Sequence, residues 1–78
     1  MQGVIKDQFE SFRSLIRSNI STIRELLEQV SRLSALVENE KNEETKKSLQ
    51  EIQSNLEAKI EELLSTTEKL FETYKKLL

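Results

Sequence analysis

Two stretches of helically spaced apolar residues, separated by a segment with none, constrain the fold of this chain most strongly. In both stretches apolar residues recur every three or four positions, with Thr67 filling one gap in the second. The stripe of the first stretch is Ile5, Phe9, Phe12, Ile16, Ile20, Ile23, Leu27, Val30, Leu33 and Val37, and that of the second is Leu49, Ile52, Leu56, Ile60, Leu63, Leu70, Tyr74 and Leu77. This spacing is typical of one face of an α-helix, whereas a strand would alternate at every second residue. The pattern therefore predicts an all-α chain with two long helices.

The polar segment between the two stretches predicts where the chain reverses. Residues 38–48 contain no apolar side chain, so a continuous helix would carry its apolar stripe through Glu40, Glu44 and Lys47. We therefore expect an antiparallel hairpin with helices at about 4–38 and 43–77 and a turn at about 39–42, forming a single domain over residues 1–78. One continuous helix is the alternative, because no Pro or Gly marks the break.

Local signals favour helix ends at the same place. Asn39 suits a left-handed C-terminal cap, and Asn42 can accept a backbone N–H as the N-cap of the second helix. Glu43 and Glu44 then lie in the first turn, where the helix dipole favours acidic side chains.

The register of the two stretches supports the hairpin. In an antiparallel pair, residues that face each other have numbers with a constant sum. The apolar positions give sums of 82 or 83 for pairs such as Leu33 with Leu49, Ile20 with Leu63, and Phe9 with Tyr74. Each helix of about 35 residues would be ~50 Å long.

The composition disfavours most enzyme chemistry. The 78 residues include no His and no Cys, which removes the usual proton shuttle, a thiolate nucleophile, a zinc site and a disulfide. We therefore expect a non-enzymatic protein without a metal or another cofactor. The absence of Cys fits a reducing compartment, so we expect a soluble cytoplasmic protein. A net charge of −2 disfavours nucleic acid as a partner, and no apolar run reaches the ~20 residues needed to insert into a membrane.

Apolar residues beyond the two stripes predict an association surface. A two-helix hairpin buries only a narrow seam, and apolar residues left outside it mark an interface. We expect a homodimer that forms a four-helix bundle or a coiled-coil-like assembly, and a groove for a helix of another protein is the alternative. Beyond the stripes lie Leu15, Leu26, Leu36, Leu64, Phe71 and Leu78. The residues expected to mediate association are Leu15, Leu26, Leu64 and Phe71 from this set, together with Leu27 of the first stripe.

Polar residues on the first helix carry two further hypotheses. Asn19 lies at or beside the stripe, where a polar group can fix register or oligomeric state; alternatively it points to solvent. A narrow basic stripe on the helix flank could bind phosphates, as in Rop-like RNA-binding bundles, or could be a solvated face. Its residues are Lys6, Arg13, Arg17 and Arg24.

Two short patterns resemble the N-terminal regulatory domain of syntaxins. They are Ile16-x-x-Asn19-Ile20-x-x-Ile23 and Thr45-Lys46-x-x-Leu49-x-x-Ile52, within residues 9–65. The resemblance implies two of the three helices of that family's antiparallel bundle. It also implies non-catalytic regulation through SNARE-type helices or their accessory proteins, with Asn19 and Ile20 at the family's Asn-plus-aliphatic position.

The function expected from the sequence is therefore protein–protein association through the apolar faces of a helical hairpin. A syntaxin-like regulator and a Rop-like RNA-binding bundle are the alternatives.

Overall fold

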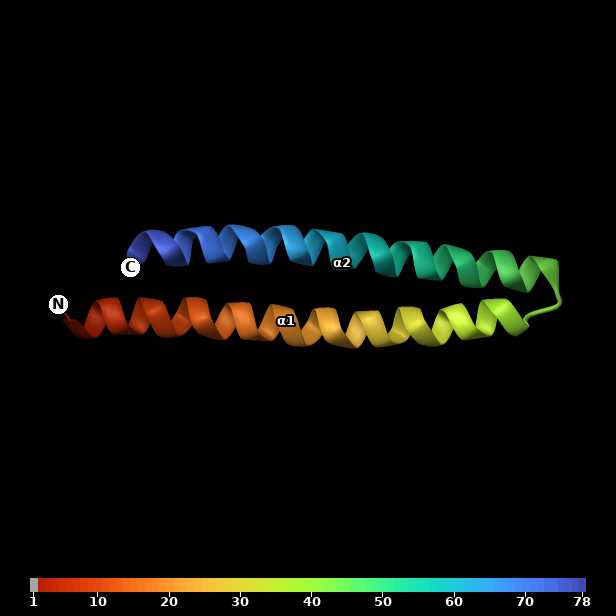
Figure 1. Cartoon of the computed structure of the whole chain (residues 1–78), viewed down its shortest axis with the longest axis horizontal. Helices are drawn as coiled ribbons and strands as arrows, with labels where there is room; N and C mark the ends of the chain where they lie inside the picture. Colours follow the sequence, from red (N-terminus) through yellow and green to blue (C-terminus); the bar gives the residue numbers. More distant parts are fainter. Residues whose placement is uncertain (1) are drawn as a thin grey trace.

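The computed structural model is a hairpin of two long α-helices (Figure 1). It describes the backbone of residues 2–78 and the side chains of residues 6–78, so the predicted stripe residue Ile5 lies outside the described side chains. Helix α1 spans Gln2–Asn39 and helix α2 spans Glu43–Leu77. The all-α hairpin fold is thus confirmed, with both helices ending within two residues of the predicted bounds.

The hairpin is an elongated rod. Its principal extents are 62 × 15 × 12 Å and its Cα radius of gyration is 17.9 Å. A compact domain of this length would have a radius of gyration of about 12 Å. The start of α1 and the end of α2 lie at one end of the rod and the turn lies at the other (Figure 1). In such a shape each helix has one helical neighbour, so little of its surface is covered.

The two helices meet along one seam whose inward positions alternate strictly by three and four residues. The most buried side chains are Ile16, Ile23, Ile60 and Thr67, each with 7–8% of its surface exposed. Side chains at the remaining inward positions are half-buried. On α1 these are Phe9, Phe12, Asn19, Leu26, Val30, Leu33 and Val37, and on α2 they are Leu49, Gln53, Leu56, Leu63, Leu70 and Tyr74. This seven-residue repeat is the seam of a two-stranded coiled coil.

The predicted stripe was wrong by one residue at three places. Ile20, Leu27 and Ile52 were assigned to the stripe, but they are 37%, 52% and 49% exposed. Asn19, Leu26 and Gln53 occupy the seam instead. A seam with a strict period of 3.5 residues can follow only one of two neighbouring positions, because consecutive residues point about 100° apart.

Specific contacts between the helices confirm the antiparallel register. The rings of Phe9 and Tyr74 pack edge to face with centroids 5.5 Å apart and an interplanar angle of 78°. Gln53 Nε2 donates a hydrogen bond to Ser34 Oγ across 2.6 Å, the one side-chain hydrogen bond between α1 and α2 in the part of the chain described. Thr67 fills its predicted seam position, and its hydroxyl donates to the Leu63 carbonyl of the same helix at 2.7 Å.

The turn occupies residues 40–42 and is closed by side chains of Asn and Glu. Asn42 is the N-cap of α2, as predicted, and its side-chain oxygen accepts the Thr45 N–H at 3.1 Å. Glu40 Oε1 accepts the Asn42 N–H at 3.0 Å. Glu43 and Glu44 lie in the first turn of α2. These bonds satisfy backbone donors that the start of an α-helix leaves without a partner.

The left-handed cap predicted at Asn39 is wrong. No described residue has a positive φ, and Asn39 remains in α1. Its Nδ2 donates to the Ala35 carbonyl at 3.0 Å, while the Glu40 N–H donates to the Val37 carbonyl at 3.3 Å. A left-handed backbone costs a residue other than Gly about 1–2 kcal/mol. The tighter turn after Val37 avoids this cost.

Substitution of seam and non-seam isoleucines should separate the two positions energetically. We expect Ile60→Val to lower the free energy of unfolding by about 1 kcal/mol, because it removes a buried methyl group. Ile52→Val makes the same chemical change at an exposed position and should leave the value within about 0.5 kcal/mol. Chemical denaturation followed by circular dichroism measures both. Equal losses would contradict the observed seam.

The cap of α2 should contribute measurably to stability. We expect Asn42→Ala to lower the free energy of unfolding by about 1 kcal/mol, because the Thr45 N–H loses its acceptor. Asn42→Asp keeps an acceptor and should retain most of the stability. If both variants unfold at the same denaturant concentration as the wild type, the capping bond contributes nothing.

Candidate functional site

Large apolar side chains outside the seam lie on both flanks of the hairpin, and four of them share one flank. Ile20 and Leu27 on α1 directly follow the inward residues Asn19 and Leu26. Leu64 and Phe71 on α2 likewise follow the inward residues Leu63 and Leu70. We call these four residues, Ile20, Leu27, Leu64 and Phe71, the apolar flank; they are 37%, 52%, 44% and 45% exposed.

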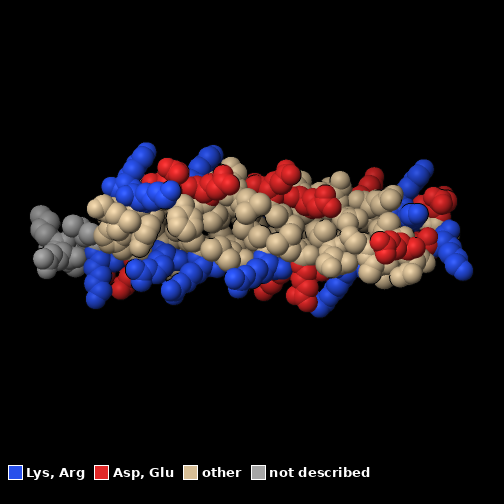
Figure 2. All heavy atoms as spheres, viewed as in Figure 1, with Lys and Arg blue, Asp and Glu red and all other residues tan. Residues whose placement is uncertain are grey.

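The handedness of the helices places these four residues on the same side. In Figure 1, α1 runs from left to right below α2, which returns from right to left. In a right-handed helix, the residue after each inward position then turns toward the viewer on both helices. Figure 2 shows this face, with an uncharged band along the hairpin between basic side chains at the lower left edge and acidic side chains above the middle.

The register brings the flank residues of the two helices together. The contacting pairs Phe9–Tyr74 and Ser34–Gln53 have residue numbers that add to 83 and 87. Ile20 and Leu64 add to 84, so they lie at the same level of the rod. Phe71 lies two helical turns beyond Leu64, and a shallow, open depression is lined by both residues. Ile20 and Leu64 therefore lie opposite each other on this flank, whereas Leu27 and Phe71 lie at the levels of Glu57 and Arg13, which follow the inward residues Leu56 and Phe12.

The five residues predicted for association do not form one surface. Leu27, Leu64 and Phe71 lie on the apolar flank, whereas Leu26 is half-buried in the seam. Leu15, 52% exposed, precedes the inward residue Ile16 and so lies on the opposite flank. Leu36 and Ile52 also precede inward residues and share that opposite flank with Leu15.

The sequence-based prediction missed Ile20 as a surface residue because it placed Ile20 in the stripe. Asn19 was the available signal: if the polar residue occupies the seam, the next residue turns out of it. A strict seven-residue count from Phe12 and Phe9 leads to Asn19 and Ile16, not to Ile20.

Asn19 lies inside the seam, half-buried between the inward positions Ile16 and Ile23. Its amide takes part in none of the hydrogen bonds between described side chains, and no described polar atom is fully buried without a partner. The amide therefore retains contact with water. A polar group in a seam lowers stability relative to an apolar residue, but it disfavours other registers.

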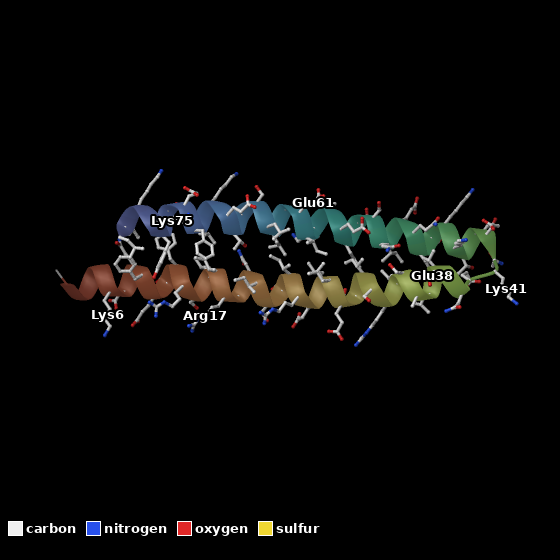
Figure 3. The ribbon with its side chains drawn as sticks, viewed as in Figure 1. Lys6, Arg17, Glu38, Lys41, Glu61 and Lys75 are labelled. Carbon is white, nitrogen blue, oxygen red and sulfur yellow. The ribbon has the colours of Figure 1, made fainter. Side chains whose placement is uncertain are left out.

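The predicted basic stripe is exposed along α1. Lys6, Arg13, Arg17 and Arg24 are all on the surface, and Figure 3 shows Lys6 and Arg17 pointing away from α2. The ion pairs among described side chains join Arg32 to Glu28 at 2.8 Å, Lys59 to Glu62 at 4.0 Å and Lys75 to Glu72 at 4.0 Å. Each pair lies within one helix, so the stripe forms no ion pair with α2 in the region described.

The described residues contain no group of three or more acidic side chains placed to hold a metal ion. Neither α1 nor α2, over the residues described, has an apolar stretch long enough to cross a membrane. Comparison of the chain with family models, curated proteins and solved structures finds no match.

Replacing the seam asparagine should stabilise the hairpin. We expect Asn19→Leu to raise the free energy of unfolding by about 1 kcal/mol, because an apolar side chain fills a half-buried position. Asn55→Leu is the matched control at an exposed position of α2 and should change the value little. Chemical denaturation at one fixed protein concentration measures both. A loss of stability in Asn19→Leu would contradict this interpretation of the amide.

Proposed function

We propose that the chain is a non-enzymatic association module that joins protein chains through the apolar flank. The observation that carries the proposal is the exposure of four large apolar side chains on one flank of the hairpin. Contiguous apolar surface of this kind marks interaction sites in soluble proteins.

The extent of the exposed surface supports the proposal. The accessible surface is 6324 Å² for a chain of 9.1 kDa. A compact monomer of this mass exposes about 4,900 Å², so the hairpin has an excess of about 1,400 Å². A typical protein interface covers about 800 Å² on each partner. Covering an interface of this size would therefore remove more than half of the excess surface.

The size of the core points in the same direction. Only three apolar side chains in the described part of the chain are buried, and none is buried completely. Fully burying one aliphatic side chain contributes roughly 1.5–3 kcal/mol, while ordering each residue costs about 1–2 kcal/mol of backbone entropy. A partner that covers the apolar flank supplies the additional burial that a lone hairpin lacks.

Association should depend on the apolar flank and stabilise the fold. At tens of micromolar, we expect the molar mass of the wild type measured by sedimentation to exceed the monomer mass of 9.1 kDa. We also expect its unfolding temperature to rise with protein concentration. The variant Leu27→Gln, Leu64→Gln, Phe71→Gln keeps the seam and should sediment as a monomer. Analytical ultracentrifugation and circular dichroism at several concentrations measure these outcomes.

The matched control is Leu15→Gln, Leu36→Gln, Ile52→Gln, which removes the same number of exposed apolar side chains from the opposite flank. It should associate as the wild type does. A wild-type chain that stays monomeric, with a high unfolding temperature independent of concentration, would contradict the proposal.

A further inference from the structure

Two columns of exposed charged residues border the apolar flank. On α1 the column residues directly follow the inward residues Phe9, Ile16, Ile23, Val30 and Val37, so they are seven residues apart. The column on α2 follows the equivalent inward positions of that helix. We call them the α1 column and the α2 column. The α1 column is Glu10, Arg17, Arg24, Ser31 and Glu38, and the α2 column is Lys47, Ser54, Glu61, Glu68 and Lys75.

The columns lie on the outer edges of the face that carries the apolar flank. A column residue points about 130° away from the seam, compared with about 75° for a residue of the apolar flank. Figure 3 shows Arg17 pointing away from α2 and Glu61 pointing away from α1. No ion pair joins α1 to α2 among the described side chains, so the columns do not pair within one chain.

The two columns nevertheless have complementary charges at all four of their charged levels. Read in antiparallel order, each α1 residue meets an α2 residue of opposite charge, or a serine meets a serine. The residue numbers of each pair add to 85, which lies between the sums of 83 and 87 for the two contacts inside the hairpin. The pairs are Glu10 with Lys75, Arg17 with Glu68, Arg24 with Glu61, Ser31 with Ser54, and Glu38 with Lys47.

From this complementarity we infer that the partner on the apolar flank is a second copy of this chain, related by a two-fold axis parallel to the helices. This axis keeps every residue at its level along the rod and places α1 of one copy on α2 of the other. The α1 column of each copy then borders the α2 column of its partner within reach of all four ion pairs. The product is a four-helix bundle in which neighbouring helices are antiparallel.

The charges disfavour the other symmetric arrangements. A two-fold axis across the rod would lay α1 of one copy antiparallel on α1 of the other. Any alignment in which the middles of the two α1 helices overlap would then place Arg17 or Arg24 beside an arginine of the partner. Packing through the opposite flank would bring together the outer columns that contain Glu25 and Glu62, which lie at the same level and have the same charge. Like charges that face each other select against these packings.

Apolar contacts and charges have different roles in the inferred dimer. Ile20 of each copy lies over Leu64 of the other, while Leu27 and Phe71 lie farther along the rod in opposite directions, at the levels of Glu57 and Arg13 of the other copy. Burial of these side chains provides most of the affinity. Exposed ion pairs contribute little individually, so the columns chiefly determine which helix lies on which.

The inference rests on the proposed function, and cross-linking tests its geometry separately. The chain has no Cys, so a single one can be introduced without interference. We expect a short bismaleimide to join Arg24→Cys chains to Glu61→Cys chains when the two variants are mixed, and to join neither variant to itself. Arg24→Cys joined mainly to itself would overturn the two-fold axis while leaving association intact.

Charge reversal tests the pairing of the α1 column with the α2 column of the second copy, without a cross-linker. We expect Arg17→Glu, Arg24→Glu to raise the dimer dissociation constant at least about tenfold, because four opposite-charge pairs per dimer become like-charge pairs. Glu61→Arg, Glu68→Arg should weaken self-association similarly, and an equimolar mixture of the two variants should form a heterodimer. The control Lys69→Glu, Lys76→Glu makes the same change in net charge on the opposite side and should leave the constant within about threefold.

These outcomes separate the two levels of the proposal. A wild-type monomer at high micromolar concentration overturns both the dimer and its supporting function. Two results would overturn only the pairing of the α1 column with the partner's α2 column. The first is an oligomer that is unaffected by charge reversal at Arg17 and Arg24, and the second is an oligomer that is lost equally in the Lys69 and Lys76 control. Sedimentation velocity at two salt concentrations distinguishes these results.

Discussion

A two-helix rod has a single seam, and the limited width of that seam governs the rest of this structure. Each helix has one neighbour, so only the positions of a seven-residue repeat are covered. Ile16, Ile23 and Ile60 are the apolar side chains that become buried in the described region, and each is near the middle of the rod. The sequence supplies more apolar residues than one seam can cover. Part of this surplus lies on the apolar flank, because Ile20, Leu27, Leu64 and Phe71 follow inward positions, and part lies on the opposite flank, because Leu15, Leu36 and Ile52 precede them.

The fold was predictable because its determinants are local and repeated many times. About ten apolar positions on each helix agree on the helical period, and the polar segment at residues 38–48 excludes a continuous stripe. Asn42 and the two glutamates after it mark the start of α2 through hydrogen-bonding and dipole effects that act within one turn. The pair Phe9–Tyr74 followed from antiparallel counting alone.

The surface was harder to predict because it depends on differences of one residue. Leu26 and Leu27 are chemically identical, and only the period of the whole seam decides which one faces α2. At Asn19–Ile20 apolarity alone favours Ile20 for the stripe, yet continuity of the seam places the Asn19 amide inside. An error of one position turns a side chain by about 100°, so it moves a residue from the core to an interface. The charge columns become visible only after the inward positions are known, since their complementarity is defined relative to the seam.

The start of α1 and the end of α2 lie at the same end of the rod, away from the turn. A two-fold axis along the rod would preserve this polarity, so the starts of both α1 helices and the ends of both α2 helices would lie together, and both turns would lie at the opposite end. Protein segments fused to these ends would all be held at one end of the four-helix rod, about 60 Å from the two turns.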